Sequence, residues 1–317
     1  MSEKRGIFSL EEFYDLQLSG ETTTIFDPFV YRKNSTNFGY LGGGSSNNSN
    51  QSDYSSIYKV DYSNDVHTVI SSFSVGNINA QAAAGNSDFA YFMGGNVGYA
   101  NDRSDLYRLD YSNDGTTPLS RGPLSAGRRN AAAVGNLNFG YLAGGNLSKS
   151  NINRVDYAND TATPSPKGNL MGNRVWNGAV GTLNYGYFIG GNQYYPTIGQ
   201  VSYTERMDYS NDSAALTPKG NLWNNLQSMA TMGNTDYGWY AGGIANGPVT
   251  SRTARIDYAN DSSTSSIRAK LPDETAYAGG HGNSTQGYTA GGYKYSATYT
   301  SYKIDYANDT ATASPAG

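Results

Sequence analysis

One five-residue string, Asp-Tyr-(Ser/Ala)-Asn-Asp, recurs six times in the 317 residues and constrains the fold more than any other feature of the sequence. The copies recur at intervals of 46 to 52 residues and begin at Asp61, Asp110, Asp156, Asp208, Asp257 and Asp305. Self-similarity at such a period is the signature of a repeat architecture, in which each repeat is one supersecondary unit. The chain is therefore expected to contain six equivalent units.

A second marker, an aromatic residue followed by two further residues and Gly-Gly, precedes every copy of the string by 15 to 21 residues. It begins at Tyr40, Tyr91, Tyr141, Tyr187, Trp239 and Tyr288. A glycine pair at the end of a strand allows close backbone approach or a positive φ. Two markers that recur in a fixed order define the same unit independently.

Each unit divides into four expected strands, as the third unit illustrates. The first is small and apolar, the second runs into Gly144-Gly145, the third alternates apolar and polar residues, and the fourth is a short outer strand that ends at Pro164. These strands are residues 130–134, 139–143, 152–157 and 161–163. The Asn and Asp side chains of 158–160 favour a turn between the last two strands.

Four antiparallel strands at a period near 50 residues predict an all-β fold, a six-bladed β-propeller over residues 24–317. The Gly pair, the aromatic of the third strand, and Arg128 and Arg174 ahead of the first strands resemble the kelch motif. The outer-strand tryptophan of kelch repeats is missing, and the tyrosine of the five-residue string is expected to take over its packing.

Several longer strings resemble repeats of virion proteins from tailed bacteriophages, especially marine ones. They are DYANDTATASP, KGNL and GNxNFGYxxGG, and the opening RGIFSLEEFYDLQLSG is similar to short N-terminal modules of such proteins. The resemblance implies a virion protein that is assembled in the host cytoplasm and exposed on the particle exterior. Its implied partners are other capsid or tail proteins and host-surface glycans.

Residues 1–23 are expected to form an arm with one short helix. Ser9 and Glu12 fit a capping box, and Gly20 ends the helical pattern. A helix of this length is marginal alone in water, so it should dock on its own propeller or anchor the chain to another virion protein. The apolar anchor candidates on one helical face are Leu10, Phe13, Tyr14 and Leu18.

Composition limits the classes of partner and cofactor. The formal charge is −4, and the Lys and Arg residues are scattered. They form no basic stripe that would bind nucleic acid or an anionic membrane surface. The sequence also has no apolar run long enough to insert in a membrane. The absence of cysteine excludes disulfides and thiolate metal sites, and two histidines cannot make a three-histidine zinc site. The aspartates of the strings are read as turns rather than Ca²⁺ ligands. No cofactor and no metal are expected.

Strand parity places the loops after the second strands and the connections before the first strands on one face, where the units differ. A residue found in all units serves the scaffold, whereas a binding site needs only a few. Tyrosine suits sugar faces and protein hot spots. The candidate contact residues on this face are Tyr54, Tyr99, Arg103, Arg128, Arg174, Trp176, Tyr194, Tyr195, Tyr203, Trp223, Tyr293, Tyr295 and Tyr299.

The same residues argue against catalysis. A sialidase-like, glycan-cleaving propeller would need a carboxylate pair, or a tyrosine nucleophile with an arginine cluster. The sequence offers two matching arginines, one acidic loop pair at Asp273-Glu274, and no Gly-x-Ser-x-Gly motif. A noncatalytic role in capsid decoration, in a tail fibre or in receptor binding is therefore expected, with the hydrolase as the alternative.

Overall fold

The computed structural model describes residues 37–45, 54–98, 101–146, 149–195, 198–294 and 300–317. The described chain is all-β, built from short antiparallel strands, and its helical elements are single 3-10 turns. The expected helix of the arm, with Leu10, Phe13, Tyr14 and Leu18, lies outside the described residues, as does the rest of residues 1–36.

The sheets follow one another in sequence order. A three-stranded sheet contains β1 (Phe38–Gly42), β2 (Ser56–Asp61) and β3 (Val66–Ser72). Two four-stranded sheets follow, β4 (Ala82–Gly85), β5 (Phe89–Met93), β8 (Leu106–Asp110) and β9 (Leu119–Ser120), then β10 (Ala132–Gly135), β11 (Phe139–Ala143), β12 (Asn151–Asp156) and β13 (Ser165–Asn169).

Three more four-stranded sheets complete the series. They are β15 (Gly178–Gly181), β16 (Tyr185–Ile189), β19 (Thr204–Asp208) and β20 (Thr217–Pro218); β22 (Ala230–Gly233), β23 (Tyr237–Ala241), β25 (Arg252–Asp257) and β26 (Ser266–Lys270); and β27 (Gly279–Gly282), β28 (Gln286–Ala290), β29 (Ser301–Asp305) and β30 (Ser314–Pro315).

Shorter strands and turns decorate this series. The strands are β6 (Asn96–Val97), β7 (Asn101–Asp102), β14 (Asn173–Val175), β17 (Asn192–Tyr195), β18 (Gly199–Gln200), β21 (Leu226–Gln227) and β24 (Ile244–Ala245). The 3-10 turns are η1 (Tyr111–Asn113), η2 (Tyr157–Asn159), η3 (Tyr209–Asn211), η4 (Tyr258–Asn260) and η5 (Tyr306–Asn308).

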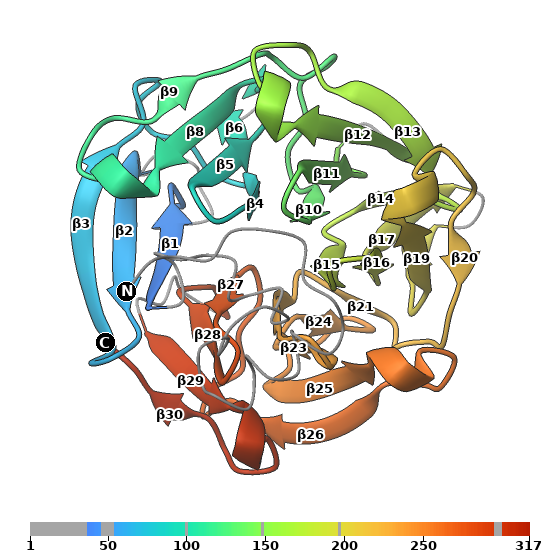
Figure 1. Cartoon of the computed structure of the whole chain (residues 1–317). Coiled ribbons are helices and arrows are strands. Elements are labelled where there is room, and N and C mark those ends of the chain that lie inside the picture. The colour runs from blue at the N-terminus through green and yellow to red at the C-terminus, as the bar shows by residue number, and fades with distance from the viewer. Residues whose placement is uncertain (1–36, 46–53, 99–100, 147–148, 196–197, 295–299) are drawn as a thin grey trace, which may run out of the picture.

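Figure 1 shows the sheets arranged around a common centre, with β4, β10, β15 and β27 nearest the centre and β9, β13, β20 and β26 outermost. The innermost strands contact one another in the order β4, β10, β15, β22 and β27, and β27 also contacts β1. The last sheet in the sequence therefore lies against the first.

The division of the third unit was predicted correctly for its first three strands, but the outer strand was misplaced. Residues 161–163 continue the turn, in which the Ala162 N–H donates to the Asn159 carbonyl (3.2 Å). The strand is β13, which begins after Pro164 and includes Pro166 opposite Asn153. Proline is tolerated there because an edge strand needs no N–H on its free side.

Three residues of the five-residue string, the two aspartates and the tyrosine, make recurring contacts of different kinds. The first aspartate caps the turn that follows, as when Asp156 accepts from the Ala158 N–H (3.0 Å). The tyrosine stacks on the aromatic of the preceding sheet's Gly-Gly marker, with ring centroids 5.0 Å apart for Tyr209 on Tyr141. The other stacked pairs are Tyr40–Tyr111, Tyr91–Tyr157, Tyr187–Tyr258, Trp239–Tyr306 and Tyr288–Tyr62.

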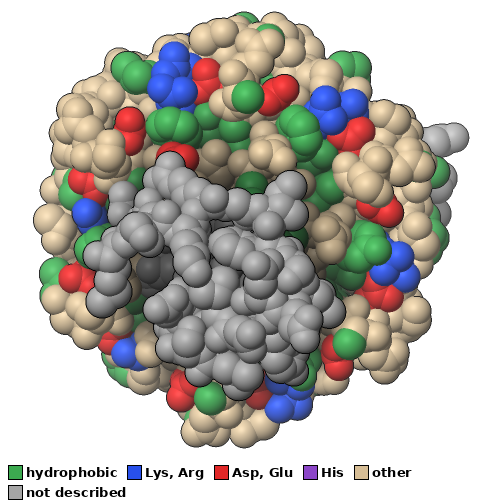
Figure 2. Space-filling model, in the orientation of Figure 1, with side chains coloured by type: hydrophobic (Ala, Val, Ile, Leu, Met, Phe, Trp, Pro, Cys, Tyr) green, Lys and Arg blue, Asp and Glu red, His purple; other side chains and the backbone are tan. Residues whose placement is uncertain are grey.

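The last aspartate of the string makes a charged junction between neighbouring sheets. Asp212 accepts from the Tyr141 hydroxyl (3.0 Å) and forms ion pairs with Arg154 (2.8 Å) and Lys167 (3.2 Å) of the preceding sheet. Equivalent aspartates are Asp65, Asp114, Asp160, Asp261 and Asp309, each bound to an aromatic side chain and at least one cation. Figure 2 shows acidic and basic side chains next to one another around the periphery of the molecule.

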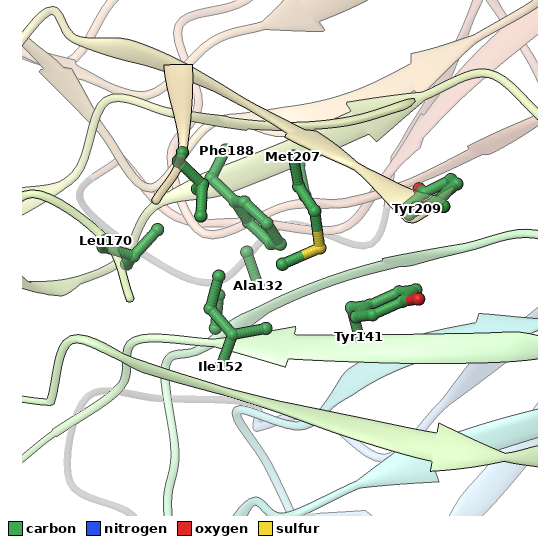
Figure 3. Packing of buried hydrophobic residues seen from close by; sticks show 10 residues of the cluster. Ala132, Tyr141, Ile152, Leu170, Phe188, Met207 and Tyr209 are labelled. Atoms are coloured by element: carbon green, nitrogen blue, oxygen red, sulfur yellow. The ribbon is translucent and has the colours of Figure 1, made fainter. Parts of the chain in front are cut away.

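Apolar packing fills the space between the sheets. In Figure 3, Tyr141 and Ile152 of one sheet face Phe188, Met207 and Tyr209 from the next sheet and its turn. All five side chains are buried, and burial of such side chains is the dominant favourable term in folding. Core and junction together fix the positions of the loops that carry the candidate site.

Candidate functional site

The connections that precede the innermost strands lie beside the loops that follow the second strands. Strand β14 pairs with β17, β21 pairs with β24, and isolated bridges join Asn79 to Asn96 and Ala276 to Tyr293. These pairings confirm that the two kinds of segment share one face of the molecule. We call this the loop face, and it carries the described candidate contact residues other than Arg128 and Arg174.

Arg128 and Arg174 are buried below the loop face, which the sequence did not reveal. Their exposed fractions are 1% and 0%. Arg128 donates to the Asn153 side chain (2.7 Å), whereas Arg174 forms an ion pair with Glu205, which is also fully buried. Burial lowers the pKa of both guanidiniums to about 10. These internal partners conflict with the hypothesis that the two arginines contact a ligand directly.

Five residues at equivalent positions form an inner ring at one end of the innermost strands. The inner ring consists of Ala80, Asn130, Trp176, Ser228 and Tyr277, each two residues ahead of the first residue of its innermost strand. All five have a left-handed backbone, with φ between 55° and 60°. The N–H of Asn130 donates to the carbonyl of Ala80 (3.1 Å), and the same bond recurs from each ring residue to the one before it, at 2.8 to 2.9 Å.

The backbone of the inner ring is therefore repeated, while its side chains differ between units. The rings of Trp176 and Tyr277 meet edge to face with centroids 6.3 Å apart, although Ser228 of the intervening unit separates them along the inner ring. Trp176 is half-buried and Tyr277 has an exposed fraction of 48%. A left-handed conformation costs a non-glycine residue about 1–2 kcal/mol, and bulky residues rarely adopt it.

A second exposed apolar region lies on the β17–β18 hairpin, beside the inner connection of the same unit. Tyr194, Tyr203 and Ile198 are exposed there, Ile198 to 83%. An open depression of about 220 Å³ is lined by Ile198, Gly199, Gln200, Val201, Tyr203 and Asn225. The backbone of Tyr195 belongs to β17.

The remaining candidates are distributed over the loop face or lie outside the described residues. Tyr54 is exposed, and Arg103 forms an ion pair with Asp105 (2.6 Å). Trp223 is half-buried under the Arg252 guanidinium (5.1 Å), and Tyr293 is held by its backbone bridge. Tyr99, Tyr295 and Tyr299 lie outside the described residues. The described candidates therefore do not converge on one point.

Sequence reasoning missed Tyr277, Ser228, Ile198 and Glu205. Tyr277 and Ser228 could have been found by aligning the units, because each stands two residues after the position of Arg128 and Arg174, as Trp176 does. Ile198 and Glu205 offered no such signal. Their importance comes from exposure and burial, which depend on the neighbouring strands.

In the part of the chain that the structure describes, no three His, Asp or Glu side chains gather closely enough to hold a metal ion. None of the helical segments described has the length and apolar character to cross a membrane. Comparison with protein-family models and with curated proteins gave no significant match to this chain.

Proposed function

We propose that the chain closes into a six-bladed β-propeller with a noncatalytic role, and that it acts as a binding or decoration module on the exterior of a tailed-phage virion. In this proposal the sheets form the ring, and the loop face contacts either a host-surface glycan or a neighbouring capsid or tail protein. The virion setting rests on the resemblance of the repeats to phage virion proteins.

Contacts between the first and last sheets support the closed ring. The Tyr288 hydroxyl donates to Asp65 (2.6 Å), Lys303 pairs with the same carboxylate, and Ala316 packs with Val60. This is the junction found between all other neighbouring sheets. A closed ring requires the last unit to contact the first, which joins residues more than 200 positions apart in the chain. The hydrogen bond between Tyr288 and Asp65 spans 223 positions.

The functional part of the proposal rests on a difference between the repeated side chains, which hold the sheets together, and the unrepeated side chains, which are exposed on the loop face. The last aspartates of the strings, the marker aromatics and the cations of the third strands are engaged in contacts between sheets, so these carboxylates are already paired with cations. The exposed aromatic residues of the loop face, such as Tyr194, Tyr203 and Tyr277, are not repeated. Exposed aromatic side chains on rigid elements are typical of recognition surfaces.

Immunogold labelling of purified particles tests the proposal. Antibodies against the chain should label the exterior of particles of a phage that encodes it, at a regular position on the capsid or tail. A chain that is present in infected cells but absent from purified particles would contradict the virion role. Hydrolysis of a glycan by the purified chain would contradict the noncatalytic role.

A further inference from the structure

We infer that Trp176 and Tyr277 form a binding site for a neutral saccharide at the inner ring. This inference rests on the proposed recognition role of the loop face and specifies its ligand. It starts from the left-handed backbone of the two residues and from the uncharged polar groups around them.

Backbone hydrogen bonds explain why the inner-ring residues are left-handed, but they do not explain why two of these residues are large and aromatic. Hydrogen bonds from one ring residue to the next hold all five positions at the same φ, whatever the side chain. Glycine fits that conformation without strain, and the chain uses glycine at both positions of its Gly-Gly markers. Two large aromatic residues at positions where glycine is favoured require a further reason, and contact with a ligand supplies one.

The chemistry of the inner ring matches a sugar without charge. Its five residues carry two aromatic rings, one amide, the hydroxyls of Ser228 and Tyr277 and one methyl group, and none of them is an aspartate, glutamate, histidine, lysine or arginine. Aromatic rings can pack on the apolar C–H face of a saccharide, while its hydroxyls need polar partners. An anionic or cationic ligand would find no opposite charge on these residues.

One unsatisfied buried group within the inner ring supplies such a partner. The Ser228 hydroxyl is buried and has no hydrogen-bond partner among the described residues. Ser228 separates Trp176 from Tyr277 along the inner ring. Buried polar groups are normally hydrogen-bonded, so a hydroxylated ligand or water is expected to complete the site at this hydroxyl.

The competing explanation is that the aromatic pair only fills the end of the ring of sheets. Ala80→Gly, Trp176→Gly and Tyr277→Gly distinguish the two, because Ala80 and Trp176 have the same φ of 55° and all three changes have the same effect on the backbone. If the pair binds a ligand, Trp176→Gly should melt within a few degrees of Ala80→Gly. If the pair is a filler, Trp176→Gly should melt well below it.

The probe is a printed array of neutral and sialylated glycans, with melting temperatures measured for every variant. We expect the full chain and Ala80→Gly to bind a neutral glycan equally, and Trp176→Gly and Tyr277→Gly to bind it at least tenfold more weakly. Undiminished binding by both aromatic variants overturns the site but leaves the proposed function intact. Binding by the full chain to no neutral glycan, or a melting loss specific to Trp176→Gly, also overturns it; particle labelling then decides the proposed function separately.

Discussion

Glycine at the end of the second strand is required by a neighbour and not only by its own backbone. Gly144 has φ +73°, and a Cβ atom there would lie 2.6 Å from the Arg174 carbonyl oxygen of the next sheet. Gly98 has φ +67°, but a Cβ atom there would meet nothing within 4 Å. A side chain at Gly98 would therefore meet only backbone strain, whereas a side chain at Gly144 would meet both backbone strain and a steric collision.

Substitution of these two glycines by alanine should have unequal effects. Gly98→Ala should cost about 1–2 kcal/mol of unfolding free energy through strain alone, whereas Gly144→Ala should cost about 3 kcal/mol or more because a backbone carbonyl must also move. Urea unfolding of both variants measures the difference. Equal losses would show that the contact between the sheets yields without cost.

The first aspartate of the string acts locally. Because Asp156 caps η2 through the Ala158 N–H, Asp156→Ala should lower the free energy of unfolding by about 1 kcal/mol, and Asp156→Asn should retain most of it. Thermal unfolding of the two variants checks the expectation. A loss as large in Asp156→Asn as in Asp156→Ala would argue against capping.

At the scale of elements, the junctions hold each sheet against the next. Burial raises the pKa of Asp212, but hydrogen bonds from Lys167, Tyr141 and Arg154 outweigh it and hold the pKa below its usual value. Ion pairs of this kind stabilise only while the carboxylate is charged. The contribution of the junction is therefore complete above about pH 4 and is lost as the pH falls below the usual pKa of an aspartate.

Removal of one junction charge should be far more damaging than removal of an exposed one. Asp212→Asn leaves Arg154 and Lys167 without their partner and should cost about 2 kcal/mol. Glu274→Gln removes the exposed pair with Lys294 and should cost less than about 0.5 kcal/mol. Similar unfolding midpoints in denaturant for the two variants would contradict a structural role of the junction.

The strands were predictable from local patterns, whereas the junctions were not. Alternation and turn residues located the second and third strands of the third unit, but Tyr141 and Asp212 are 71 positions apart, and no local pattern states that they meet. The outer strand was misplaced because proline was read as its end, although an edge strand admits proline. The arginines were assigned to the surface because burial depends on packing between neighbouring segments.

At the scale of the whole molecule, the contact between the first and last sheets differs from the others. His281 stands where the equivalent strands carry Ala84, Val134, Val180 and Met232, each opposite the aromatic of the Gly-Gly marker. Its Nδ1 is 2.9 Å from the Tyr62 hydroxyl, and its ring stacks on Tyr288. His67, the other histidine, is near enough to lower the pKa of His281.

This contact should weaken in mild acid. Burial lowers the pKa of His281 to about 3, and the charge of His67 adds to this. A histidine whose pKa is lower in the folded than in the unfolded state stabilises the fold above its unfolded pKa of about 6.5, and the stabilisation is lost as the pH falls. Burial also lowers the pKa of His67, so His67 acts in the same direction.

Between pH 7 and pH 5, wild-type protein should lose about 1–2 kcal/mol of unfolding free energy through His281, and His281→Val should abolish that part of the loss. The carboxylate at this contact, Asp65, does not titrate in this range, because hydrogen bonds from Lys303 and Tyr288 outweigh the effect of burial and lower its pKa. Melting curves at pH 7, 6 and 5 measure the effect, and His67→Gln measures separately the part of the loss that comes from His67. Parallel losses in wild type and His281→Val would show that this contact does not limit the stability of the ring in acid.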